Sequence, residues 1–326
     1  MRGRTVSFVL LGLGAFALVA ALAVRLVLAP SLVKLPLDQS AYPEADGTGI
    51  TMFDFGTMSE VDGVTGTVYQ TVEGQPGHPD ADDDTAVWNF GSVIEDDEGT
   101  ILNEGSYRAC IDRGTAESAP DCSAAFVDKY PEARIEGLTL TFPFHTEQRD
   151  YELFNLSAAA SFTAEFVAVE EIDGLEVYRF EQTIPETVVR EEEIPGAMAG
   201  EPDETSVAGE FVYSNVRTLW VEPTSGVIVT AEERPVTVLR GPAGNTGVTW
   251  LSGTFTATAE TTREGVERAE DTRSQIVLIE TTVPLSLAGL GVLLVIGGVL
   301  VGRRAGAGDT DRPAAGASAR QPVPVS

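Results

Sequence analysis

His145 lies in a stretch, residues 142–155, FPFHTEQRDYELFN, whose side chains could support acid–base chemistry. It is one of two histidines in the chain, and Glu147, Arg149 and Asp150 follow it closely. Histidine is the side chain whose ordinary pKa suits a general base near neutral pH. A hydrolase could use such a group, but a solvent-facing histidine at the end of a strand is far commoner. The sequence contains no GxSxG, HExxH, Walker or GxGxxG motif. We therefore expect no catalytic residues and a protein that is not an enzyme.

A second group of chemically capable residues is the acidic loop 78–85, HPDADDDT. Carboxylate oxygens are the ligands that calcium prefers. The spacing lacks the mid-loop glycine and distal glutamate of an EF-hand, so a solvated acidic loop is the favoured interpretation. Weak cation binding is the alternative, and we expect no metal site and no cofactor.

Two long apolar runs determine where these residues lie. Residues 5–24 and 281–302 carry no charged side chain. Because a helix rises about 1.5 Å per residue, about 20 apolar residues cross a bilayer core of about 30 Å. Both runs are long enough to span a membrane. The first one could instead be a cleaved signal peptide, although its apolar part exceeds the usual length of a signal core. In the second run, Gly298 and Gly302 form a GxxxG pattern that permits close packing against the first.

Charge predicts the orientation of the two spans. Arg2 and Arg4 precede the first run and Arg303 and Arg304 follow the second, and positive residues beside a span stay cytoplasmic. Both termini are then cytoplasmic, in the plasma membrane, and the large middle region is extracytoplasmic. The tail after residue 302 is small, polar and rich in proline, which is typical of disordered chain.

The acidic composition of the middle region limits its partners. The chain has 50 acidic and 21 basic residues, a formal charge of −29. The basic side chains near the two ends make the middle region more negative still. Nucleic acid and anionic membrane surfaces repel such a region, so we expect no nucleic-acid partner. An anionic lipid would have to be held locally by a few donors.

The two cysteines, Cys110 and Cys122, both lie in the region expected outside the cytoplasm. An even pair in that compartment is best interpreted as a disulfide. It would close a loop of about a dozen residues and stabilise the fold by about 3 kcal/mol in the chain-entropy model. A metal site would need further ligands, and His78 and His145 do not have the required spacing.

The middle region is patterned mainly for strands. Residues 137–144, GLTLTFPF, alternate strictly between apolar and polar, and residues 66–74, 85–104 and 248–262 also contain strand patterns. Asp173-Gly174 predicts one hairpin turn and residues 223–226 predict another. Helical patterns are fewer, one at 123–133 and one at 261–282. The fold class we predict is α+β: a mainly antiparallel ectodomain, a twisted sheet or partial barrel with a few helices, between two transmembrane helices.

Aromatic residues are frequent in these strand patterns, and their default interpretation is an ordinary packed core. A curled sheet can also enclose an apolar cavity that accepts acyl chains, and sequence does not separate the two cases. Arg149 and Tyr151 could position a headgroup or pair with neighbouring acids. The candidate ligand-binding residues are Phe142, Phe144, Arg149, Tyr151, Phe162 and Phe166.

The order of several segments resembles one actinobacterial envelope family. The most specific of these are FPFHTEQRDY (142–151) and EPTSGVIV (222–229), accompanied by CIDRGTAE (110–117), a stalk and a second span that begins with Pro-Leu. The family is known as the PorA porin family and as a domain of unknown function, and the chain is also similar to the LmcA proteins of mycobacteria, associated with lipoglycan assembly. The resemblance covers residues 1–302. Family members tend to carry an acidic residue at position 145, which argues against a catalytic role for His145.

The resemblance implies a lipid-accommodating, β-rich ectodomain between two anchors. We expect a non-enzymatic envelope protein that binds or transfers a membrane lipid or lipoglycan, with envelope proteins as further partners. The alternatives are a structural scaffold and a porin or pore-assembly protein, although the polar outer faces of the strands do not suit a membrane barrel. The predicted domains are an anchor (1–30), the β-rich domain (31–260), a helical stalk (261–282), a transmembrane helix (283–302) and the tail (303–326).

Overall fold

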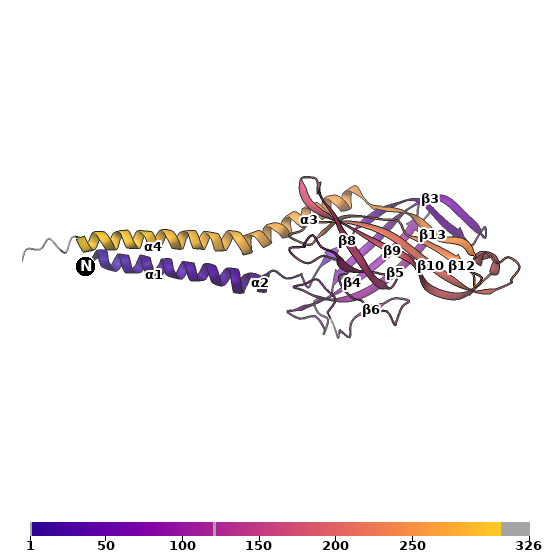
Figure 1. Ribbon diagram of the computed structural model, residues 1–326, viewed down its shortest axis with the longest axis horizontal. Helices are drawn as coiled ribbons and strands as arrows, with labels where there is room; N and C mark the ends of the chain where they lie inside the picture. The colour runs from indigo at the N-terminus through magenta and orange to yellow at the C-terminus, as the bar shows by residue number, and fades with distance from the viewer. Residues whose placement is uncertain (1, 120–121, 308–326) are drawn as a thin grey trace, which may run out of the picture. The chain divides into compact units, whose positions relative to one another are not determined.

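The computed structural model describes residues 2–119 and 122–307, so most of the predicted disordered tail lies outside the described residues. The chain divides into two compact units. One, the helix-pair unit, consists of Met1–Leu32 and Val277–Ser326. The other, the sheet unit, is Val33–Ile276. Figure 1 shows the helices and strands that build each unit.

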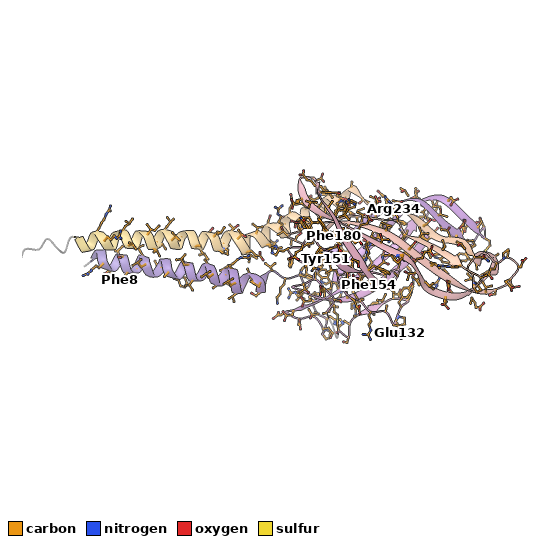
Figure 2. The ribbon with its side chains drawn as sticks, in the orientation of Figure 1. Phe8, Glu132, Tyr151, Phe154, Phe180 and Arg234 are labelled. Atoms are coloured by element: carbon orange, nitrogen blue, oxygen red, sulfur yellow. A yellow bond between two sulfur atoms is a disulfide. The ribbon has the colours of Figure 1, made fainter. Side chains whose placement is uncertain are left out.

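The helix-pair unit contains the two apolar segments predicted as spans. α1 (Arg2–Ala23) continues through the π-helical η1 (Val24–Leu28) into α2 (Ala29–Leu32), and η3 (Leu278–Thr282) leads into α4 (Val283–Ala307). Both segments are long and apolar enough to cross a membrane. Large apolar side chains such as Phe8 of α1 are exposed, as suits contact with lipid (Figure 2).

Glycines let α1 and α4 pack closely against each other. Each of Gly14 and Gly291 has the backbone carbonyl of the other within 3 Å of the position that a Cβ would take. The Ser7 hydroxyl donates a hydrogen bond of 2.7 Å to the carbonyl of Gly298. Small residues favour this close backbone approach between apolar helices. The GxxxG glycines Gly298 and Gly302 do lie against the first apolar helix, as their spacing suggests.

The sheet unit is built from antiparallel strands and one long helix. The long strands are β2 (Glu44–Asp54), β3 (Ser59–Gly74), β4 (Thr85–Asp96), β5 (Ile101–Asp112), β8 (Ala160–Ile172), β9 (Leu175–Ile194), β10 (Val207–Val221) and β13 (Thr246–Ala257). The shorter elements are β1 (Ser40–Ala41), β6 (Phe126–Val127), β7 (Tyr151–Asn155), the 3₁₀ helix η2 (Gly196–Ala199), β11 (Ile228–Glu233) and β12 (Val236–Arg240). The helix α3 (Ala259–Val277) follows β13.

The strands form one sheet in the order β6-β5-β4-β3-β2-β13-β11-β10-β9-β8-β7, with β1 beside β3 and β12 beside β10 and β13. The two edges of this sheet are linked through irregular chain. Leu138 bridges β7 at Leu153 and also pairs with Glu117, whose neighbour Ser118 bridges β5 at Ile111. The sheet therefore curls into a partial barrel. This confirms the predicted α+β class with a mainly antiparallel sheet and two apolar helices.

Two predicted hairpin turns are confirmed. Asp173 and Gly174 both have positive φ, 49° and 84°, which is the type I′ geometry that joins β8 to β9. Residues 223–226 join β10 to β11, with Gly226 at φ 70°. A Cβ at Gly226 would lie 2.1 Å from the Phe142 carbonyl oxygen, so this turn also depends on glycine for space.

Two local predictions are wrong. Residues 137–144 are not a strand, and residues 123–133 contain the short strand β6 instead of a helix. The alternation in 137–144 is misleading because Leu138, Thr139, Thr141 and Phe142 are all buried. The segment meets β7 only through the single bridge at Leu138, and its Phe142 N–H donates to Gly226 in the loop after β10, so it does not run along a strand as a regular ladder.

The helix α3 packs on the sheet through Val266 and Ala269, which contact Leu175, Val177 and Val229. Most of the segment expected as a stalk is therefore helical and belongs to the sheet unit. The predicted limits of the domains stay predictions.

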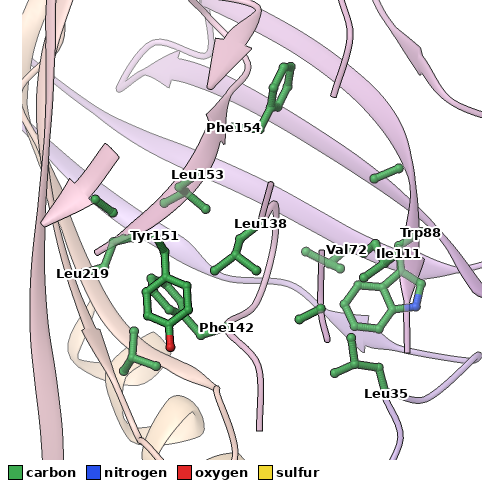
Figure 3. Packing of buried hydrophobic residues seen from close by; sticks show 14 of the residues in the cluster. Leu35, Val72, Trp88, Ile111, Leu138, Phe142, Tyr151, Leu153, Phe154 and Leu219 are labelled. Atoms are coloured by element: carbon green, nitrogen blue, oxygen red, sulfur yellow. The ribbon is translucent and has the colours of Figure 1, made fainter. Parts of the chain in front are cut away.

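The largest apolar core lies between the two halves of the curled sheet. Figure 3 shows Tyr151 beside Phe142, and Trp88 with Leu35 and Ile111. Phe142 and Phe180 are fully buried, with ring centroids 4.7 Å apart, and Tyr151 contacts both rings edge-on. Burying aromatic rings of this size contributes strongly to stability.

Candidate functional site: a cavity inside the curled sheet

The sheet unit contains a cavity of about 840 Å³ that is partly open to solvent, and the larger part of its wall is apolar. Small-molecule sites in proteins occupy about 300–1,000 Å³, so the volume suits an organic ligand. The residues in the wall come from most strands of the sheet and from α3.

Strand periodicity explains how this wall is formed. On β4 every second residue, Trp88, Phe90, Ser92 and Ile94, lines the cavity. β3 contributes Val68, Gln70 and Val72 in the same alternation, and β11 contributes small residues such as Ala231. A sheet of this many strands curls around more space than such side chains fill.

One part of the wall is formed by segments that adjoin the apolar helices in the sequence. Lys34, Leu35, Thr272 and Gln275 line the cavity. Lys34 and Gln275 are each two residues from the helix-pair unit along the chain. The wall therefore includes residues from both points at which the chain passes between the two units.

A group of polar side chains, which we call the polar cluster, interrupts the apolar wall. Its members are Tyr107, Tyr213, Arg217 and Glu233, which line the cavity, and the buried Gln182 and Asn215 behind them. Arg217 Nε donates to Glu233 Oε1 at 2.9 Å, and Arg217 Nη1 donates to Gln182 Oε1 at 3.2 Å. Only 16 % of the Arg217 side chain is accessible. Because Arg217 is a cavity-lining residue, it is a charged group inside the fold that a ligand can reach.

Two buried amides hold the polar cluster in place. Gln182 Nε2 donates to the carbonyls of Leu153 and Phe162, which leaves its oxygen to accept from Arg217. Asn215 Nδ2 donates to the Tyr213 hydroxyl and to Glu233 Oε2. Because Gln182 and Asn215 have all these hydrogen-bond partners, they hold Arg217 and Glu233 in one position before any ligand arrives.

The protonation states of the polar cluster follow from its surroundings. Burial raises the pKa of the Tyr107 hydroxyl, and burial together with Glu233 raises the pKa of Tyr213 to about 12. Burial is the largest effect and opposes the charge of Arg217, but Glu233, Tyr213 and Tyr107 together outweigh it, so the net pKa of Arg217 is raised. At neutral pH both tyrosines therefore keep their protons, and Arg217 is a cation.

The segments 142–151 and 222–229, named above for their family resemblance, bind each other. The N–H of Phe142 donates to Gly226, the N–H of His145 donates to Thr224, and the N–H of Thr146 donates to Pro223. Within the turn, the buried Glu222 carboxylate accepts from the N–H groups of Thr224 and Ser225. These segments form a structural junction, and its residues Phe144, Ser225 and Val227 line the cavity.

The structure places the six predicted ligand-binding residues in three environments: the cavity wall, the packed core and the exposed surface. Of the six, Phe144 lines the cavity. Phe142, Tyr151 and Phe166 pack around Phe180 in the core, and Phe162 packs against Ala158, Ile184 and Tyr213. Arg149 is exposed and lies over the Tyr151 ring, 4.0 Å from its centroid. The predicted headgroup site at Arg149 and Tyr151 is therefore outside the wall of the large cavity.

The remaining predicted groups have structural roles. Cys110 and Cys122 form the predicted disulfide. In the acidic loop, Asp80 Oδ2 accepts from the Ser123 hydroxyl and the Ala124 N–H, and Asp82 Oδ1 accepts from two N–H groups of the loop. Asp80 lies near both cysteine sulfurs, but sulfurs joined in a disulfide are not free to be thiolate ligands.

Comparison with known proteins decides the family. The family model described as Porin PorA matches residues 6–300. The chain belongs to the Porin PorA family. A curated relative, Porin PorA of Corynebacterium amycolatum, is 27 % identical over 191 residues, which are 47 % of this chain and 50 % of that protein. The chain thus matches about half the length of this relative.

Among solved structures, a Bacteroides fragilis protein described as exported and as having a YmcC-like fold covers 69 % of this chain and 97 % of its own. It is 8 % identical with a TM-score of 0.20, which is too low to support an argument from the fold.

In this PorA-family chain, sequence reasoning missed Arg217. A signal for it exists in the alternation along 211–221, FVYSNVRTLWV, which places Arg217 on the same face as Phe211, Leu219 and Val221. A cation among inward apolar residues is costly and marks either an internal ion pair or a ligand site. Its partners Gln182 and Glu233 come from other strands and could not be paired with it from sequence.

Proposed function

We propose that this PorA-family protein is a non-enzymatic, membrane-anchored envelope protein whose sheet unit holds the apolar part of a lipid. The observation that carries the proposal is the cavity, which is large, mostly apolar and lined by residues from most strands of the sheet. Apolar wall that stays in contact with water costs free energy, and a bound apolar chain would remove that contact. A lipid or lipoglycan chain would fill the cavity without any bond being made or broken.

The two apolar helices support this function by keeping the cavity at a source of lipid. Lys34 and Gln275 connect the wall almost directly to the helix-pair unit along the chain. We further propose that both termini are cytoplasmic and that the sheet unit is extracytoplasmic, in agreement with the flanking arginines and the disulfide.

The test is lipid retention by the full chain. The protein is purified in amphipol, a fluorescent fatty-acyl probe is titrated in, and co-purified lipid is identified by mass spectrometry. Ala231→Phe places a ring in the cavity wall and should reduce probe binding at least about tenfold. Val167→Phe adds the same ring at an exposed strand position and should leave binding unchanged. If neither lipid nor probe binds the wild-type protein, lipid holding is excluded.

Membership of the Porin PorA family supports a second function, in a pore or its assembly. Conductance in planar bilayers containing the purified full chain would test it. Stepwise, reproducible channels that persist in Ala231→Phe would favour the pore, because such channels would not depend on the lipid cavity.

A further inference from the structure

The polar cluster has a property that an apolar cavity alone does not require. It brings a fixed cation, an anion and two protonated tyrosines to the wall of a mostly apolar space. A carrier that recognised hydrocarbon only would be more stable with apolar residues at these positions, since buried ion pairs seldom stabilise a fold.

The charges of the cluster are already balanced within the protein. Arg217 and Glu233 form a direct ion pair, and the second oxygen of Glu233 accepts from Asn215. An anionic headgroup beside Arg217 would therefore also meet the Glu233 carboxylate, at a place where water screens charge poorly. The cluster is suited to an uncharged polar group.

Two groups of the cluster keep unused hydrogen-bond donors. Guanidinium has five N–H groups, and the described residues accept from Nε and Nη1 of Arg217. Tyr107 lines the cavity, lies within electrostatic reach of Arg217, and makes no side-chain hydrogen bond to the part of the chain that the structure describes. Its ring is held by Phe90 and Phe154, so the hydroxyl has a defined position.

We propose that the polar cluster is a recognition site for an uncharged acyl lipid, whose ester or hydroxyl oxygen accepts hydrogen bonds from Tyr107 and Arg217 while its chain fills the cavity. This proposal rests on the lipid-holding function proposed above and names the class of lipid. The protein then distinguishes neutral acyl esters both from plain hydrocarbon and from free fatty-acid anions.

The experiment is a competition among three probes. The full chain in amphipol is incubated with equal amounts of methyl palmitate, nonadecane and palmitate at pH 8, repurified, and its bound probes are quantified by gas chromatography and mass spectrometry. Methyl palmitate and nonadecane contain the same number of heavy atoms, so their ratio isolates the effect of the ester. One or two hydrogen bonds predict an ester enrichment of about twofold to tenfold in the wild-type protein.

The decisive variant is Tyr107→Phe, which removes the hydroxyl and keeps the ring between Phe90 and Phe154. It should lower the ratio of ester to alkane by about twofold or more, the share of one hydrogen bond, without reducing alkane binding. Tyr178→Phe, whose ring packs on Phe166 outside the cavity wall, is the matched control and should keep the wild-type ratio. The double variant Arg217→Met with Glu233→Met removes both charges together and should also lower this ratio.

The outcomes separate this proposal from the one on which it rests. If the wild-type protein binds alkane and ester equally, or if Tyr107→Phe keeps the wild-type ratio, the recognition site is refuted while lipid holding stands. If palmitate binds most strongly, the cluster is an anion site and the proposal is wrong. If no probe binds, lipid holding itself fails.

Discussion

Buried polar side chains of the sheet unit obtain their partners from distant parts of the chain. Gln182 of β9 bonds to β7, β8 and β10, and Asn215 of β10 bonds to β11. Such bonds add little net stability when made but cost about 1–3 kcal/mol when one partner is missing. Among the described residues, Thr139 Oγ1 is the side-chain atom that is cut off from solvent and has no hydrogen-bond partner.

Thr139→Val should therefore stabilise the protein. It replaces an unsatisfied hydroxyl with a methyl group of similar shape, and we expect the free energy of unfolding to rise by about 1 kcal/mol. The matched control is Thr141→Val, because Thr141 Oγ1 donates to the Gly226 carbonyl at 3.0 Å and its loss should destabilise the fold by a similar amount. Denaturant midpoints measure both. Equal losses in the two variants would mean that Thr139 has a partner in solution.

The lowered pKa of Asp80 predicts that the free energy of unfolding depends on pH. The Ser123 hydroxyl lowers the pKa of Asp80 below its ordinary 3.8, aided by the Ala124 N–H. A carboxyl whose folded pKa is depressed contributes stability above the unfolded pKa and loses it as pH falls through the folded pKa. Asp80→Asn should therefore weaken the fall in stability below about pH 4. Urea unfolding at pH 7, 4 and 3 tests this, with the exposed Asp203→Asn as the control. Parallel profiles for all three proteins would contradict it.

At the scale of elements, the helix pair and the curled sheet depend on different local rules. α1 and α4 associate through glycine contacts and the Ser7 hydroxyl, with few other polar groups between them. The sheet depends on tight turns and on the irregular segment around Leu138, which links its two edges. In the helix pair and in the turns of the sheet, two backbone segments come closer together than a side chain larger than that of glycine would allow.

The pairing of α1 with α4 predicts a specific cross-link. A Cβ at Gly302 would lie 3.6 Å from the Ser7 Cβ, within the usual range for a disulfide. Ser7→Cys combined with Gly302→Cys should therefore oxidise to a bond that holds the two helices together after proteolysis of the sheet unit. A Val9→Cys and Gly297→Cys pair is the control, because Val9 is exposed and a Cβ at Gly297 would meet nothing. Failure of the first pair to cross-link would contradict the packing, or show that α1 is cleaved as a signal peptide.

For the whole molecule, the arrangement in the membrane is the property on which function depends. The proposed topology predicts that protease added to intact spheroplasts degrades residues 33–276 and leaves a tag at the C-terminus protected. Its physical basis is the arginines beside the two apolar helices, which resist translocation. Arg303→Glu with Arg304→Glu removes the positive charge beside the second apolar helix, so part of the C-terminal tag should become accessible to protease. Protection of residues 33–276 in the wild-type chain would overturn the topology.

The sequence by itself determined the features that depend on neighbours along the chain. The two apolar helices, the Asp173-Gly174 turn, the antiparallel class and the Cys110–Cys122 pair all follow from local patterns of hydropathy, turn residues or cysteine count. The family followed from segments such as 142–151 and 222–229. Each of these features can be recognised from a short stretch of the chain or from the amino-acid composition, without knowledge of which distant residues meet.

Only the tertiary structure decided which inward side chains meet and what space they leave. Phe142 and Phe144 look alike in sequence, yet Phe142 is fully buried in the core and Phe144 lines the cavity. Arg217, Gln182 and Glu233 became one cluster because three strands brought them together. The physical reason is that an alternating pattern specifies the face of a strand but not the curvature of the sheet, and the curvature decides whether that face encloses a packed core or a cavity.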